Sequence, residues 1–101
     1  MSVPLRDQIE AVLQTVHDPE IPVNIWELGL VYELKIKEDV VWITMTLTAP
    51  ACPVAGEIIA EVQQKVEAIQ GVKEVHVQLT FDPQWTRDMM SDEARLELGW
   101  L

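Results

Sequence analysis

The chain has 101 residues, which is enough for one domain with a hydrophobic core and too few for two. Hydrophobic residues make up 49% of it and charged residues 24%, a composition typical of a globular protein. Seventeen acidic residues against seven basic ones give a formal charge of −10, and such a surface repels nucleic-acid phosphates and anionic lipid head groups. We therefore expect neither a nucleic acid nor a membrane as a partner.

The N-terminal residues lack the basic-then-apolar pattern of a secretion signal, and no apolar run approaches the roughly 20 residues that a membrane span requires. Cys52 is the only cysteine, so no disulfide can form within the chain, which agrees with a reducing compartment. We expect a cytoplasmic protein that forms a single domain over residues 1–101.

The first predicted element is a helix. Apolar residues recur at helical spacing from Leu5 to Val16, and this apolar face ends near His17. Ser2 is the expected cap of the helix, with Pro4 inside its first turn.

A loop and a hairpin follow. Residues 18–30 are rich in proline yet too apolar for a solvated linker, which predicts an ordered loop, and Asn24 is expected to cap a single turn that Gly29 closes. Residues 31–37 and 40–48 alternate between apolar and polar, so each is a predicted strand with one buried face. The two residues between them predict a tight turn and hence a hairpin. The buried face is expected to carry Tyr32, Leu34, Ile36, Val41, Ile43, Met45 and Leu47, and the other face Trp42, Thr44, Thr46 and Thr48.

A long apolar stripe from Val54 to Ile69 predicts a second helix, which Gly71 ends. A third strand is predicted where apolar and polar residues alternate again from 74 to 81, with Phe81 on its apolar side.

A short last helix is predicted near the C-terminus. Ser91 is its expected cap, Leu96 and Leu98 are its expected apolar anchors, and Gly99 is expected to end it. The order helix, strand, strand, helix, strand, helix, with strands apolar on one side only, predicts an α+β fold. We expect a two-layer domain in which helices cover one face of a three-stranded sheet. The order of the strands in the sheet does not follow from the sequence.

Cys52 lies where the pattern of the second strand gives way to that of the second helix. Pro53 favours the first position of a helix, which makes Cys52 the expected N-cap. Unpaired backbone N–H groups and the helix dipole there favour thiolate over thiol, the form that a nucleophile or a metal ligand needs. The alternative is a buried cysteine that only fills space.

Other polar residues near these motifs could take part in chemistry. Asp18 and Glu20, on either side of a proline, could bind a cation, act as general bases or only cap turns. His17 is expected to interact with the last carbonyls of the first helix rather than to act as a ligand. The hydroxyl of Thr48, four residues before Cys52, could hydrogen-bond to a thiolate or a substrate, or the residue could merely complete the strand.

The sequence supports none of several enzyme classes. It has no glycine-rich phosphate loop, no Cys-x-x-Cys pair, no His-Glu-x-x-His motif and no Gly-x-Ser-x-Gly elbow. His76 lies on a predicted strand, and nothing in the sequence brings it to Cys52 to form a catalytic pair. The tryptophans are expected to pack in the core or at its rim, while an exposed one would mark a contact surface. They are Trp26, Trp42, Trp85 and Trp100.

Three parts of the sequence resemble the SufT/PaaD-like family of accessory proteins in iron–sulfur cluster assembly. They are residues 18–32 (DPEIPVNIWELGLVY), residues 48–53 (TAPACP) and Trp85 after the third predicted strand. The resemblance spans nearly the whole chain, and it implies a compact α+β fold that acts in the maturation of iron–sulfur proteins, as a carrier or a targeting adaptor. The PaaD branch carries a cysteine-rich C-terminal extension that this chain lacks, which favours the general assembly branch.

The resemblance also implies a site. The reactive cysteine of the family falls on Cys52, its acidic loop pair on Asp18 and Glu20, and its threonine on Thr48, and together they would line one shallow pocket. A cluster usually takes four cysteine ligands, so one thiol per chain cannot hold it alone. Two subunits of a homodimer could bridge a labile cluster with two Cys52 thiolates and small-molecule thiols, or Cys52 could act only during transfer. We expect Cys52 to be a transient metal ligand, with the iron–sulfur assembly machinery and client apo-proteins as partners.

Two other functions stay open. A pure adaptor would recruit clients through its apolar loop and acidic face without cysteine chemistry. A thiol enzyme, for example a one-cysteine peroxidase, would use an activated Cys52, but the threonine-to-cysteine spacing and the absence of a nearby arginine in sequence oppose it. We expect the protein not to be an enzyme.

Overall fold

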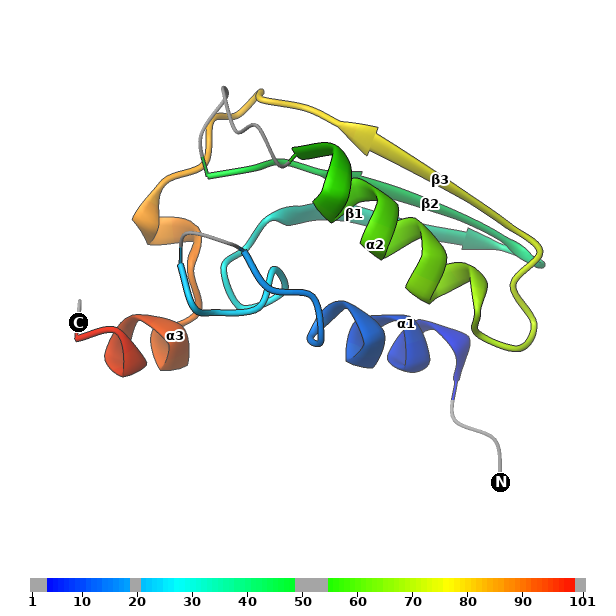
Figure 1. Cartoon of the computed structure of the whole chain (residues 1–101), viewed down its shortest axis with the longest axis horizontal. Helices are drawn as coiled ribbons and strands as arrows, with labels where there is room; N and C mark the ends of the chain where they lie inside the picture. Colours follow the sequence, from blue (N-terminus) through cyan, green and yellow to red (C-terminus); the bar gives the residue numbers. More distant parts are fainter. Residues whose placement is uncertain (1–3, 19–20, 49–54, 100–101) are drawn as a thin grey trace.

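A computed structural model describes residues 4–18, 21–48 and 55–99 (Figure 1). Seven elements follow along the chain, and their order confirms the predicted α+β fold, with a short 3-10 helix, η1, added before the last helix. They are α1 (Leu5–Leu13), β1 (Val31–Lys37), β2 (Val40–Met45), α2 (Ala55–Glu67), β3 (Glu74–Leu79), η1 (Arg87–Met89) and α3 (Asp92–Glu97).

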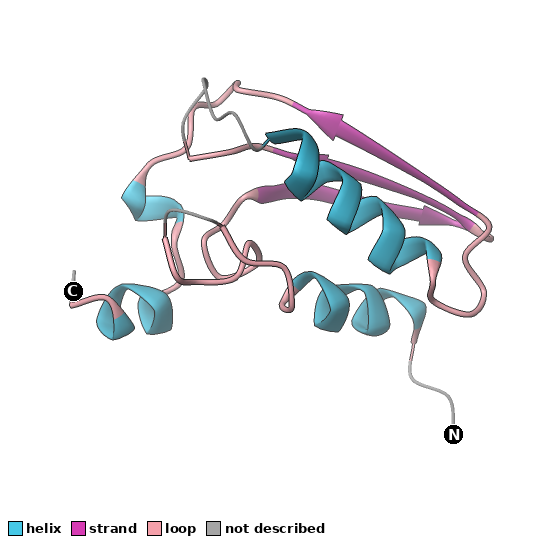
Figure 2. Ribbon diagram, viewed as in Figure 1, coloured by secondary structure: helices cyan, strands magenta, loops and turns pink. Residues whose placement is uncertain are grey.

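The three strands form one mixed sheet in the order β1-β2-β3. β1 and β2 are the antiparallel arms of the predicted hairpin, with Leu34 opposite Ile43. β2 and β3 run parallel, with Ile43 opposite Val77. Parallel neighbours need a crossover connection, and α2 lies in that connection (Figure 2).

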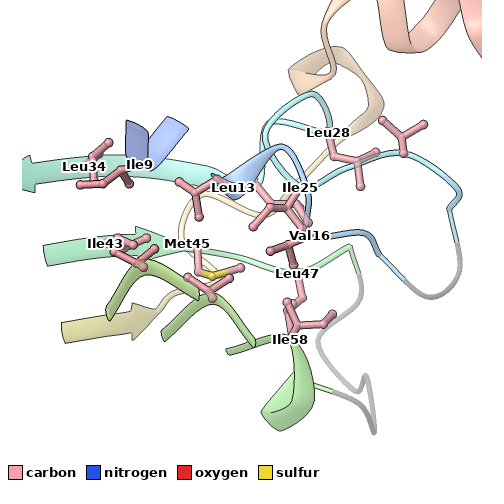
Figure 3. Packing of buried hydrophobic residues seen from close by; sticks show 14 of the residues in the cluster. Ile9, Leu13, Val16, Ile25, Leu28, Leu34, Ile43, Met45, Leu47 and Ile58 are labelled. Atoms are coloured by element: carbon pink, nitrogen blue, oxygen red, sulfur yellow. The ribbon is translucent and has the colours of Figure 1, made fainter. Parts of the chain in front are cut away.

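The core fills the space between one face of the sheet and the helices α1 and α2. Alternate residues of the strands, such as Leu34 and Ile43, join Ile9 and Leu13 of α1 and Ile58 of α2 in one buried cluster (Figure 3). We call the other face of the sheet the open face, because its charged side chains and its tryptophan are exposed to solvent. Its side chains are those of Glu33, Lys35, Lys37, Val40, Trp42, Thr44, Glu74, His76 and Gln78. Within the described residues, helices thus cover the sheet on one side only, as predicted.

Helix α1 is shorter than its apolar pattern suggests. It begins at Leu5 with Pro4 as its N-cap, rather than with Pro4 inside the first turn, and it ends at Leu13. The proposed cap Ser2 lies outside the described residues. After Leu13 the chain turns away so that the carbonyl of Val16 can accept a hydrogen bond from Ile25 N at 2.8 Å, which anchors the following loop.

The sheet is also shorter than the alternating patterns predict. β2 ends at Met45, although Thr46 N still donates a hydrogen bond to the carbonyl of Leu30, the residue before β1. β3 ends at Leu79, and Phe81 is 37% exposed instead of lying on the buried face. The alternating pattern of apolar residues therefore continues for two or three residues beyond the last paired residue of each strand.

A β-bulge in β1 overturns one predicted side-chain direction. The register shifts between Val31 and Glu33, so that Val31, rather than Tyr32, belongs with the buried face opposite Met45. Tyr32 instead donates a hydrogen bond from its hydroxyl to the carbonyl of Pro83 at 2.8 Å. The bulge therefore turns this side chain toward the segment that follows β3.

The last helix keeps its predicted cap but not its predicted anchor. Ser91 Oγ accepts a hydrogen bond from Ala94 N at 3.1 Å, as an N-cap should. Leu96 is 67% exposed, whereas Ala94 is buried and Leu98 packs against the core. Helix α3 has only six residues, so its buried side chains are those that contact the neighbouring loop. Helical spacing alone does not predict which side chains these are.

β1 is an edge strand of the sheet. It has only β2 as a neighbour, and Arg6 of α1 donates from Nη1 to the carbonyl of Leu34 at 3.1 Å. A helix side chain thus occupies a backbone acceptor of this edge strand.

Among the described residues, none of the helices has the length and apolar character that a membrane span requires.

Candidate functional site

The loop between α1 and β1 is ordered by its own hydrogen bonds. His17 and Asn24 form an isolated antiparallel bridge that closes the loop on itself. Asn24 Oδ1 accepts from Glu27 N at 2.9 Å, so Asn24 caps the single turn that the sequence predicts. Gly29 ends that turn with φ +76°, a conformation that glycine adopts without steric cost.

Asp18 is the buried carboxylate of this loop, with a relative exposure of 5%. Its Oδ1 atom accepts a hydrogen bond from Ile21 N at 3.1 Å, and its Oδ2 atom accepts one from Thr48 Oγ1 at 3.4 Å. Burial of a charged group is costly unless hydrogen bonds compensate for the lost water, and these two donors supply part of that compensation. The structure therefore brings together Asp18 and Thr48, which lie 30 residues apart in sequence.

The other two predicted site residues, Glu20 and Cys52, lie outside the described residues, as does Pro53. The predicted N-cap and the shallow pocket of four residues therefore stay predictions. The Nδ1 atom of His17 lies 3.3 Å from the carbonyl oxygen of Thr15, which is beyond the end of α1 at Leu13, rather than near one of the last carbonyls of the helix as predicted. Within the described ranges, no group of three or more His, Cys, Asp or Glu side chains is arranged to hold a metal ion.

The C-terminal segment packs against the same loop, a contact that the sequence did not indicate. Trp85 Nε1 donates to the carbonyl of Leu28 at 2.6 Å. Ser91 N donates to the carbonyl of Glu27 at 2.8 Å, and the Ser91 hydroxyl also donates to the Glu27 carboxylate. Gly29 lies so close to the backbone of Met89 that a Cβ atom would collide with the Met89 carbonyl.

These contacts give the motif at residues 26–30 a structural role. The loop that carries Asp18 is held from one side by its own turn and from the other by the segment between Trp85 and Ser91. No local pattern could have predicted this, because a tryptophan after a proline-containing turn does not specify its partner.

The burial of Thr46 is also not predicted by the alternating pattern of the strand. That pattern predicts Thr46 on the solvent-facing side of its strand, but it is fully buried, and its hydroxyl has no hydrogen-bond partner among residues 4–18, 21–48 and 55–99. A buried hydroxyl without a partner costs stability, since it has lost its bonds to water. It lies two residues before Thr48, in the stretch that leads from β2 to the segment with Cys52.

We expect Thr46→Val to stabilise the protein by about 1 kcal/mol, because valine keeps the shape of threonine and removes the unsatisfied hydroxyl. Urea denaturation followed by circular dichroism would measure the free energy of unfolding. Thr44→Val, at a half-buried position on the open face, is the matched control and is expected to change stability little. A destabilised Thr46→Val protein would mean that the hydroxyl makes a favourable interaction.

Known proteins match this sequence and this geometry. A family model described as iron–sulfur cluster assembly protein matches residues 6–78. The chain belongs to this family. The matched range of the iron–sulfur cluster assembly family contains Asp18, Thr48 and Cys52 and ends before Trp85. The resemblance read from the sequence motifs is therefore confirmed.

Several known proteins are similar to this chain over most of their length. A Porphyromonas gingivalis protein named Fe-S protein maturation auxiliary factor is 55% identical, over 95% of this chain and 92% of that one. A Staphylococcus aureus protein named Fe-S protein maturation auxiliary factor SufT is 38% identical, over 83% and 97% of the two chains. The crystal structure of a domain of unknown function from Bacillus anthracis superposes with a TM-score of 0.88 at 35% identity, over 94% and 92% of the chains.

Proposed function

We propose that this protein is an accessory factor that assists the assembly of iron–sulfur clusters or their transfer to client apo-proteins, with Cys52 as a transient ligand of the cluster. Membership of the iron–sulfur cluster assembly family supports this role, as do the names of its relatives. The structural observation that carries the proposal is the contact between Asp18 and Thr48. It connects the acidic loop to the stretch that follows β2, from which the chain continues toward the thiol.

The cluster is cargo in this proposal. A cluster usually needs four thiolates, and this chain has one cysteine, so other thiols must complete the ligand set. These can come from a second copy of the chain, from small-molecule thiols or from the donor and acceptor proteins. A site completed from outside suits transient binding, because release needs only an exchange of ligands.

Asp18 and Thr48 would support Cys52 rather than bind iron directly. The buried carboxylate fixes the Thr48 hydroxyl, which restricts the backbone where the segment that carries Cys52 begins. Glu20, two residues from Asp18, would add negative charge to the loop and favour the approach of a cation. The assembly machinery and client apo-proteins are the proposed partners, in the cytoplasm, and no enzymatic reaction is proposed.

Anaerobic reconstitution with iron and sulfide tests the proposal. The wild-type protein is expected to increase the activation of a client apo-protein and to show transient visible absorption from a bound cluster. Cys52→Ser, which nearly preserves shape and removes the thiol, is expected to lose both. Equal client maturation by the two proteins would contradict the thiol role.

The second candidate is an adaptor that recruits clients without cysteine chemistry, and a pocket beside the loop favours it. The pocket lies between α3 and the loop residues 17 and 22–27, and three carboxylates line it together with His17. They are those of Glu27, Glu93 and Glu97. An adaptor would tolerate Cys52→Ser in client maturation but would lose client binding on Asp18→Ala, Glu20→Ala or Trp26→Ala. If all three variants still capture clients, the adaptor function is wrong.

A further inference from the structure

The open face has an ordered arrangement of side chains that none of the functions above uses. The register of the sheet aligns its residues in three rows across the strands. The rows are Lys37, Val40 and Glu74, then Lys35, Trp42 and His76, then Glu33, Thr44 and Gln78.

Charge distinguishes the open face from the rest of the molecule. Lys35 and Lys37 offset Glu33 and Glu74, so with neutral histidine the face has a formal charge of zero, and the whole −10 of the chain lies elsewhere. Two copies of such a molecule repel each other over most orientations. They meet with the least repulsion when the open faces approach each other.

An aromatic side chain stands at the centre of this neutral face. Trp42 is 38% exposed and stacks on His76, with ring centroids 6.0 Å apart and an angle of 20° between the planes. A tryptophan at the centre of a patch with charged side chains around it is the usual arrangement of an interface anchor. The stack restricts the indole before any partner arrives, which reduces the entropy lost on contact.

The charges are also distributed so that the face complements itself. Its lysines lie on β1, while Glu74 lies on β3, on the other side of β2. A two-fold axis parallel to β2 places β1 of one copy over β3 of the other. Lys37 then faces Glu74 of the second copy, and Trp42 faces its own counterpart. A two-fold axis across the strands would pair Lys37 with Glu33 of the second copy, but it would also set Lys35 against Lys35, a repulsion that the axis parallel to β2 avoids.

We infer that the open face is the contact between two copies of this chain, related by a two-fold axis parallel to β2. The sheet measures only about 14 Å across its strands and about 20 Å along them, from the standard spacings of β-structure. That is small beside the surface of about 800 Å² per partner in stable complexes, so the dimer is weak and reversible.

The orientation of the two copies has a consequence for the proposed function. This consequence, unlike the dimer itself, rests on that function. With an axis parallel to β2, both copies of β2 run in the same direction. The two contacts between Asp18 and Thr48, which follow β2, then lie at the same end of the dimer. Two chains could in this way supply one thiol each to a shared cluster.

Sedimentation velocity of the metal-free full chain over a concentration series tests the interface. Lys37→Glu and Glu74→Lys should each raise the dimer dissociation constant about tenfold, because each reverses two symmetry-related ion pairs. Combining the two changes restores the opposite charges and should restore wild-type association. Lys65→Glu and Glu67→Lys on α2 are the controls, since they change the net charge equally but leave the open face intact.

The outcomes separate clearly. A wild-type chain that stays monomeric at millimolar concentration overturns the dimer. Single reversals that act no more than their controls, or a double variant that fails to recover, overturn this face and orientation. Cys52→Ser is expected to leave association unchanged, so failure of the interface and failure of the thiol role give different results.

Discussion

Gly29→Ala is expected to lower the free energy of unfolding by about 3 kcal/mol or more. Two costs combine at this position. The residue has φ +76°, which strains any side chain larger than hydrogen, and an added Cβ would collide with the backbone carbonyl of Met89. Because that neighbour is backbone, it cannot move aside as a flexible side chain would. Urea denaturation followed by far-UV circular dichroism would measure the loss.

Gly99→Ala separates the two costs. Gly99 has φ +74°, almost the same conformation, but no atom of the residues that the structure describes lies within 4 Å of its added Cβ. Its substitution should cost only about 1 kcal/mol, from conformation alone. If both variants are destabilised equally, the close approach of Gly29 to Met89 does not contribute to stability.

Asp18→Ala is expected to destabilise the protein by about 2 kcal/mol and to reduce client maturation. The substitution leaves Ile21 N and the Thr48 hydroxyl without their acceptor in a region where water is largely excluded. Asp18→Asn retains one carbonyl oxygen for Ile21 N, so its stability should lie between those of wild type and Asp18→Ala.

A double-mutant cycle isolates the contact between Asp18 and Thr48. Thr48→Val alone should cost about 1 kcal/mol, and it should cost clearly less when Asp18 is already alanine. The free energies of unfolding of the four proteins give the coupling directly. Additive effects of the two substitutions would mean that the 3.4 Å contact has no energetic weight.

Much of the fold could be predicted because it follows from local patterns. Alternation along β1 and β2, with two residues between them, specified the hairpin, and Ser91 and Asn24 were recognised as caps from their residue types and positions. The strand order depends on which edge of the hairpin β3 joins, a choice made by tertiary packing. The bulge at Tyr32 is likewise fixed by a partner in a distant segment, since its hydroxyl bonds to Pro83.

The candidate site was predictable in part for a similar reason. Asp18 and Thr48 could be named because each belongs to a motif that resembles the family, and the structure brings the two together. The contacts of Trp85 and Ser91 with the loop could not be named, since they join backbone atoms to segments far apart in sequence. The burial of Thr46 could not be predicted for another reason. Period-two alternation predicts which face of the sheet a side chain lies on, but it does not predict which other segments cover that face.

The hydrogen bond from Arg6 to the carbonyl of Leu34 has a consequence for aggregation. An exposed edge strand is a template on which a foreign extended segment can add as a further strand. Arg6 occupies an outward acceptor near the middle of β1, and the side chains of Lys35 and Lys37 on that strand add charge. A misfolded chain is therefore hindered from extending the sheet at β1. Arg6→Ala should make the protein more prone to fibril formation than its small loss of stability would explain.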